Sequence, residues 1–190
     1  GWFGGNAGAG VAGKGNAGGA MMVTHVSASA GGLAWMTGEW LKFGRPSVLG
    51  IVTGTVAGLA TITPASGYVG PGGALVIGLL AGVVCFFATT FMKRVMKVDD
   101  SLDVFPVHGV GGMLGTLLAG VFASASLGVF SGQGYAEGMD MASQTGVQVL
   151  GVLAVAAYTA VATLLVLELV RALIGLRVSA EAGTVGSDPA

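Results

Sequence analysis

Residues 72–92 of the chain read GGALVIGLLAGVVCFFATTFM and carry no charged side chain. An α-helix rises 1.5 Å per residue, and about 20 apolar residues cross the hydrocarbon core of a bilayer. This stretch therefore predicts a transmembrane helix. In lipid, helices associate by close backbone packing, which small residues permit. Two glycine stripes at a spacing of four predict such packing seams: Gly78 and Gly82 here, and Gly50, Gly54 and Gly58 upstream.

Four further stretches approach membrane-spanning length, and they lie at about residues 19–41, 47–63, 104–124 and 144–174. Residues 47–63 are short for a span, whereas residues 144–174 are long enough to tilt or to emerge. Residues 1–17 lack the charged start and cleavage site of a signal peptide. We interpret them as the remaining end of one more helix. The expected fold class is all-α, a polytopic transmembrane helix bundle over residues 1–178, with a cytoplasmic tail without fixed structure at 179–190.

The composition supports this class and excludes others. Of the 190 residues, 53% are hydrophobic and 9% are charged, whereas a soluble domain carries roughly 25% charged residues. The net charge of −1 provides no basic field for nucleic acid. Two histidines and one cysteine are too few to indicate a metal site, and no nucleotide-binding or metalloprotease motif is present. We therefore expect a membrane protein that is not an enzyme and needs no metal or cofactor.

The positive charges predict the orientation, because cytoplasmic loops are enriched in Lys and Arg. If the spans alternate, seven of the eight Lys and Arg residues fall on one side of the membrane. These seven are Lys42, Arg45, Lys93, Arg94, Lys97, Arg171 and Arg177. Only Lys14 falls on the other side. We expect a multi-pass protein of the cell membrane with its C-terminus in the cytoplasm.

His108 is the most informative polar residue, because an ionisable group at membrane depth normally faces a cavity or a partner. Gly111, Gly112 and Gly115 follow on the same face of a regular helix. That face would fit either a narrow passage or a very close neighbouring helix. Histidine suits proton handling, since its ring nitrogens can donate or accept near neutral pH. A purely structural histidine, hydrogen-bonded between helices, remains an equal alternative at this stage.

Other polar and aromatic residues receive structural interpretations. We expect His25 to be structural rather than a partner of His108. Asp103 precedes the fourth full span, where an acidic residue can cap free N–H groups and oppose the helix dipole. A role at a cytoplasmic exit is the second choice for Asp103. Trp35, Trp40 and Tyr68 are expected to anchor the helices at the membrane interfaces.

Several motifs occur in an order that resembles the ammonium transporter family (Amt/Mep/Rh). They are WFGGNAG at 2–8, KFGRPS at 42–47, ITPASGYV at 62–69, DDSLDVFPVHGVGG at 99–112 and GLRV at 175–178. The ordered combination covers nearly the whole chain to about Ser179. The resemblance implies the second half of an inverted-repeat transporter, its sixth to eleventh helices. It also implies a homotrimer in the lipid bilayer, with one narrow pore in each subunit.

The resemblance also implies roles for individual residues. His108 matches the pore histidine of the second half, and Trp2 and Val104 match pore-wall positions. The histidine contributed by the first half is absent from this sequence. Gly5 stands where the family usually has a phenylalanine of an outer gate, and Ala9 stands where it often has a serine of the outer ammonium site. These two departures affect the recruitment of ammonium.

The function implied is transport of ammonium or ammonia through a hydrophobic, histidine-lined pore. One alternative is an ammonium sensor that signals to a cytoplasmic partner, and another is an inactive, truncated subunit. A PII-family signalling protein is a candidate regulator, although the tail lacks the longer acidic and histidine-containing end seen in many members.

Overall fold

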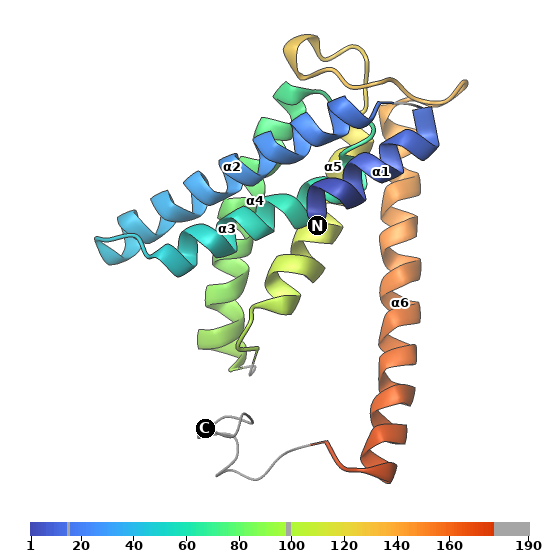
Figure 1. Cartoon of the computed structure of the whole chain (residues 1–190). Coiled ribbons are helices and arrows are strands. Elements are labelled where there is room, and N and C mark those ends of the chain that lie inside the picture. Colours follow the sequence, from blue (N-terminus) through green and yellow to red (C-terminus); the bar gives the residue numbers. More distant parts are fainter. Residues whose placement is uncertain (15, 98–99, 177–190) are drawn as a thin grey trace. The chain divides into compact units, whose positions relative to one another are not determined.

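The computed structural model describes residues 1–14, 16–97 and 100–176, without the side chains of residues 10–14. All regular elements in these ranges are helical, so the expected fold class is confirmed (Figure 1). The α-helices are α1 (Trp2–Lys14), α2 (Ala17–Phe43), α3 (Val48–Ile62), α4 (Pro71–Phe91), α5 (Val110–Phe122) and α6 (Met141–Leu173). Short 3₁₀ turns at Thr63–Ala65 and Gly128–Phe130 and π-helical turns at Met92–Met96 and Phe105–Gly109 complete the list.

The residues divide into two compact units, Gly1–Leu150 and Gly151–Ala190. The description below concerns the first unit unless α6 is named. The predicted boundary of a membrane domain at residue 178, the predicted tail at 179–190 and Arg177 lie outside the described residues. The extent of the membrane domain therefore stays a prediction.

Four helical segments in the described part of the chain are long and apolar enough to cross a membrane: Val48–Ala65, Pro71–Met96, Phe105–Phe122 and Met141–Leu173. They correspond to four of the five predicted spans. The remaining one, predicted at 19–41, forms the 27-residue helix α2. Helix α2 is not among the four segments that are long and apolar enough to cross a membrane. It carries polar side chains such as Thr24 and Ser27. Both are buried, and each donates a hydrogen bond to a backbone carbonyl, those of Ala20 and Gly58 respectively.

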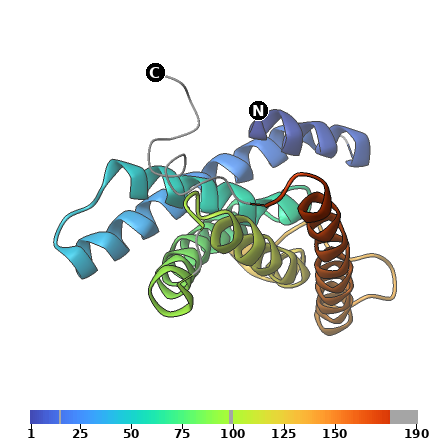
Figure 2. The same ribbon diagram turned by 90° about the horizontal axis from the view of Figure 1, so that it is seen from below.

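Glycine seams hold α2 against α3 and α4, as predicted. In Figure 2, α2 and α3 run across α4 and α5, which are seen nearly end-on. A Cβ atom at Gly58 of α3 would meet the carbonyl oxygen of Ser27 on α2. A Cβ atom at Gly78 of α4 would meet the same oxygen. Only residues without a side chain permit this approach, so the two stripes converge on one part of α2.

The connection between α2 and α3 follows its turn residues. Gly44 ends α2 with φ 75°, a left-handed conformation that suits glycine. Ser47 caps α3 by accepting a hydrogen bond from the Gly50 N–H at 2.9 Å. The carboxylate of Glu39 accepts from the Ser47 N–H at 2.6 Å and from its hydroxyl at 3.0 Å. The end of α2 and the start of α3 are therefore joined by side-chain hydrogen bonds as well as by a short loop.

The interfacial role predicted for Trp35 is wrong. Its side chain is buried, with 4% of its surface exposed, and its ring meets the edge of Phe86 at 5.5 Å between centroids. The reason is that α2 packs against both α3 and α4, so its inward face belongs to the core. Trp40 and Tyr68 are more than half exposed, and their role as anchors stays a prediction.

Candidate functional site

The first residues of α1 converge with α3 and with the turn before α5. The indole N–H of Trp2 donates a hydrogen bond to the Thr63 hydroxyl oxygen at 2.8 Å. The indole ring stacks on the imidazole of His108, with centroids 5.9 Å apart and planes inclined by 11°. The structure thus brings together two of the three residues that the sequence assigned to the pore wall. Thr63 is a neighbour that the sequence analysis did not identify.

His108 lies in the π-helical turn Phe105–Gly109 and is exposed. Pro106 has no N–H to donate, and the Val110 N–H reaches back to the carbonyl oxygen of Phe105. A π turn holds one more residue per turn than an α-helix, which rotates the residues after it. Val104 lies directly before this turn and is also exposed.

The three glycines that follow His108 do not all face the same surroundings. Cβ atoms at Gly111 and Gly115 would both meet Thr61 of α3, so these positions form a close helix contact. A Cβ atom at Gly112 would meet nothing within 4 Å. The sequence left open whether this face serves a close neighbour or a passage. Two of the glycines serve a neighbour, and the third lies beside open space.

The two altered positions lie on the outward side of α1. Gly5 and Ala9 are exposed, and a Cβ atom at Gly5 would meet nothing within 4 Å. Between them, Asn6 is buried and its amide donates to the Thr24 hydroxyl at 3.1 Å. Asn6 therefore docks α1 on α2, whereas Gly5 has room for a larger side chain.

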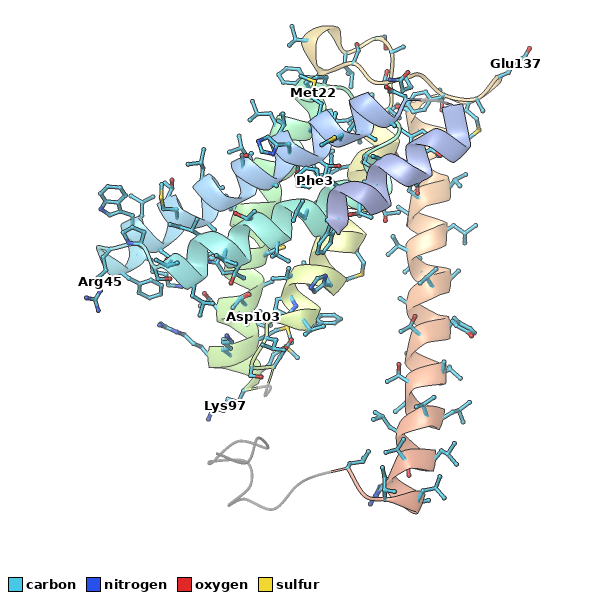
Figure 3. All side chains as sticks on the ribbon, viewed as in Figure 1. Phe3, Met22, Arg45, Lys97, Asp103 and Glu137 are labelled. Carbon is cyan, nitrogen blue, oxygen red and sulfur yellow. The ribbon has the colours of Figure 1, made fainter. Side chains whose placement is uncertain are left out.

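His25 is exposed on α2 and lies against Phe3, with ring centroids 5.9 Å apart and planes inclined by 37°. Phe3, labelled in Figure 3, is next to Trp2 in α1. The two histidines thus contact neighbouring aromatic residues of α1. The structural role that the sequence analysis assigned to His25 stays a prediction.

Asp100, not Asp103, caps the helical segment that carries His108, so the capping role expected for Asp103 is corrected. The Asp100 carboxylate accepts from the Val104 and Phe105 N–H groups, both at 2.9 Å. These two backbone hydrogen bonds, with a smaller contribution from Lys93, lower the pKa of Asp100. Asp103 has φ 55°, a left-handed conformation. The backbone carbonyl of Asp103 accepts the Val107 N–H at 3.0 Å, so Asp103 starts the segment through its backbone, while the side-chain cap comes from Asp100.

Asp103 instead forms an ion pair with Lys93, at 2.7 Å. Figure 3 shows Asp103 and Lys97 at one end of the first unit and Glu137 at the other. The pattern of positive charges predicts only the side of the membrane for Lys93, because nothing in the residue spacing indicates its partner. The exit role considered for Asp103 stays a prediction.

Among the residues that the structure describes, no group of three or more His, Cys, Asp or Glu side chains is placed to hold a metal ion. The site consists instead of an imidazole, an indole and a hydroxyl beside apolar side chains. Such groups can exchange hydrogen bonds with a small polar molecule and can present aromatic faces to a cation.

Comparison with known proteins identifies relatives of the whole chain. The sequence profile of the Ammonium Transporter Family matches residues 1–190. The chain is 43% identical to an ammonium transporter of Aquifex aeolicus over 95% of its own length and 42% of the relative's. It is 41% identical to the ammonium transporter Amt1 of Archaeoglobus fulgidus over 99% of its own length and 46% of the relative's.

Comparison with solved structures leads to relatives of the same kind. The fold matches a structure described as a sensor Amt protein with a TM-score of 0.86 and 30% identity, covering 98% of this chain and 45% of that one. It matches Saccharomyces cerevisiae Mep2 with a TM-score of 0.75 and 34% identity, covering 87% of this chain and 38% of that one. The chain thus spans somewhat less than half the length of these relatives. On its sequence and its fold, the chain belongs to the Ammonium Transporter Family.

Proposed function

We propose that the chain forms the second-half wall of a pore that passes ammonium or ammonia across a cell membrane. The observation that carries the proposal is the Trp2 indole stacked on the exposed imidazole of His108. An ionisable ring in a membrane-spanning helix is costly unless it faces a cavity or a partner. Here its neighbour is the Trp2 indole, and Gly112, four residues later in the chain, borders open space.

In the proposed mechanism, ammonium is recruited outside, loses its proton on entry and passes as ammonia along the pore. The imidazole of His108 exchanges hydrogen bonds with ammonia, and Trp2 and Val104 form an apolar wall. Such a wall disfavours hydrated sodium and potassium because it cannot replace their water. Gly5 and Ala9 occupy the outer gate and recruitment positions, so recruitment relies less on a cation–π contact than where phenylalanine is present.

The assembly extends beyond this chain. Since the matched relatives are more than twice as long as the segment they share with it, the opposite pore wall and its histidine would come from a first half. We propose a homotrimer in the lipid bilayer with the basic connections in the cytoplasm. Arg45 and Lys97, labelled in Figure 3, lie at the end of the first unit opposite Glu137, which is compatible with this orientation. A PII-family protein is the proposed regulator.

Ammonium sensing is the second candidate function, because one well-matched structure is described as a sensor Amt protein. Sensing would use the same His108 site to bind ammonium without requiring net flux. Transport and sensing therefore differ in one observable, which is the movement of substrate across the membrane.

The test is uptake of labelled methylammonium by cells that lack their own ammonium transporters. The chain is compared with a fusion in which a first half from a family member precedes it. We expect uptake by the fusion, and a loss of uptake in the His108→Ala fusion. His25→Ala is the matched control, because it removes an exposed histidine that contacts Phe3 instead of Trp2.

Two results would contradict the proposal. If the His108→Ala and His25→Ala fusions lose uptake equally, the assignment of the pore to His108 is wrong. If the inserted fusion shows no uptake but binds ammonium in a manner that depends on His108, the sensor function replaces transport. Absence of both uptake and binding would instead support the inactive subunit.

A further inference from the structure

We infer that Thr63 is a positioning residue, whose hydroxyl holds the Trp2 indole flat against His108. The consequence for transport rests on the proposed function, whereas the positioning itself can be tested without any flux. The hydroxyl group of Thr63 makes two hydrogen bonds of defined direction.

The proton of this hydroxyl is already committed. Thr63 Oγ1 donates to the Leu59 carbonyl oxygen at 2.7 Å, one turn earlier in α3. A hydroxyl has one proton and two lone pairs, so toward any other group Thr63 acts as an acceptor. The indole of Trp2 is a donor only, and it meets this acceptor at 2.8 Å. The two bonds are compatible and together fix the orientation of the hydroxyl.

The backbone that presents the hydroxyl is also constrained. Thr63 begins the 3₁₀ turn Thr63–Ala65, in which Pro64 follows directly. The proline ring fixes its own φ near −65°. The carbonyl of Ala65 then accepts from the N–H groups of Tyr68 at 2.9 Å and Val69 at 3.1 Å, which closes the turn. The acceptor for Trp2 is thus placed at a stiff point where α3 ends.

Trp2 is partly buried and packs against a cluster of apolar side chains that includes Ala60 and Val107, but apolar packing does not fix the direction of its indole N–H, whereas a hydrogen-bond acceptor does. The indole is held at its edge by Thr63 and on its face by His108. Without the edge contact, the ring can turn about its side-chain bonds and the parallel stack on His108 loosens. Thr63 therefore controls the aromatic surface that His108 faces.

The experiment uses the chain labelled with ¹⁵N-tryptophan in lipid nanodiscs. The indole N–H signal of Trp2 is assigned by its loss in Trp2→Phe, and its hydrogen-exchange rate and chemical shift are measured. Thr63→Val keeps the side-chain shape and removes the acceptor, and Thr63→Ser restores the hydroxyl. Thr53→Val is the matched control, because Thr53 lies in α3 and, like Thr63, donates to the carbonyl four residues earlier, at 2.9 Å.

We expect indole exchange about fivefold faster in Thr63→Val, since a hydrogen bond of this kind contributes roughly 1 kcal/mol and 1.4 kcal/mol is a factor of ten. Loss of the stacked imidazole in His108→Ala should shift the Trp2 indole signal, and the looser stack in Thr63→Val should shift it in the same direction. Thr63→Ser and Thr53→Val should resemble the unsubstituted chain. Together these results would show that Thr63 orients the Trp2 indole and does not act only by stabilising the fold.

Unchanged exchange in Thr63→Val would overturn the inference, and so would Thr63→Ser behaving like Thr63→Val. In the uptake assay, Thr63→Val should lower uptake by the fusion and Thr63→Ser should restore it. If the unsubstituted fusion takes up no methylammonium while the indole signals respond as expected, the proposed function fails and the positioning of Trp2 stands.

Discussion

The ammonium group of Lys93 lies 2.7 Å from the carboxylate of Asp103, and this pair joins the segment after α4 to the turn before α5. The Asp103 side chain is 15% exposed and that of Lys93 is 45% exposed. The pair is therefore less screened than an ion pair on the surface, where the median contribution to stability is about 0–1 kcal/mol.

Replacing Asp103 with asparagine should lower the free energy of unfolding by about 1–2 kcal/mol. Asparagine tolerates the left-handed backbone at this position, so the change isolates the charge. Glu168→Gln is the control, because its pair with Arg171 is long, at 3.5 Å, and both side chains are mostly exposed. That control should cost about 0.5 kcal/mol or less. Equal losses, measured by denaturant titration in detergent micelles, would contradict the importance of the Asp103 pair.

The cap formed by Asp100 predicts an acid-sensitive stability. The pKa of Asp100 is lowered in the folded state, so its contribution is complete above the ordinary carboxyl pKa of about 3.9 and is lost as the pH falls through the folded value. Asp100→Ala should cost about 1 kcal/mol at pH 7. The difference between the variant and the unsubstituted chain should shrink below about pH 4.

A non-titrating cap provides the comparison for Asp100. The Asn16 side chain accepts from the Gly19 N–H at 3.2 Å at the start of α2. Asn16→Ala should therefore cost stability by an amount that is independent of pH over the same range. If the cost of Asp100→Ala is also independent of pH, the hydrogen bonds from Val104 and Phe105 do not depend on the charge.

The glycine seam predicts a strong contrast between two glycine-to-alanine changes. A Cβ atom at Gly58 would meet the Ser27 carbonyl, whereas one at Gly146 would meet nothing within 4 Å. Gly58→Ala should lower the free energy of unfolding by about 1–3 kcal/mol, since backbone must move. Gly146→Ala should be neutral or stabilising by up to about 1 kcal/mol, because alanine favours helix. Similar effects at both positions would mean that α2 and α3 are not in close contact.

Gly5→Phe tests the altered outer gate. The position has open space, so the change should leave stability unaffected. A phenylalanine ring there should lower the apparent KM for methylammonium in the fusion by about 2- to 30-fold, the range of a cation–π contact of roughly 0.5–2 kcal/mol. Gly8→Phe, also beside open space on α1, should leave KM unchanged. An equal change in both variants would exclude a specific gate at Gly5.

Much of this structure could be predicted from the pattern of residues. Apolar length located the helices, and the glycine spacing identified the seams between α2, α3 and α4. The motif around His108 identified the family. The predictions that were wrong concerned which side of a helix faces its neighbouring helices. Trp35 looked like an interfacial residue, but α3 and α4 cover its side of α2.

The candidate site was predictable only in part, for a physical reason. Trp2 and His108 came from motifs, whereas Thr63 makes contact across helices and has no spacing signal. The π turn at Phe105–Gly109 changes the register between His108 and the glycines of α5, so counting in steps of 3.6 residues from His108 placed all three on the face of the histidine. The side-chain cap comes from Asp100 because the Asp103 carboxylate pairs with Lys93, a contact between segments that has no spacing signal in the sequence.

The most direct test of the central claim is ion discrimination by the purified fusion in proteoliposomes. Ammonium and potassium fluxes are measured with and without the His108→Ala change, with His25→Ala as the control. Our account predicts ammonium flux with little potassium flux in the unsubstituted and control proteins, and a loss of flux or of discrimination in His108→Ala. Unchanged ammonium flux together with unchanged discrimination in His108→Ala would contradict it.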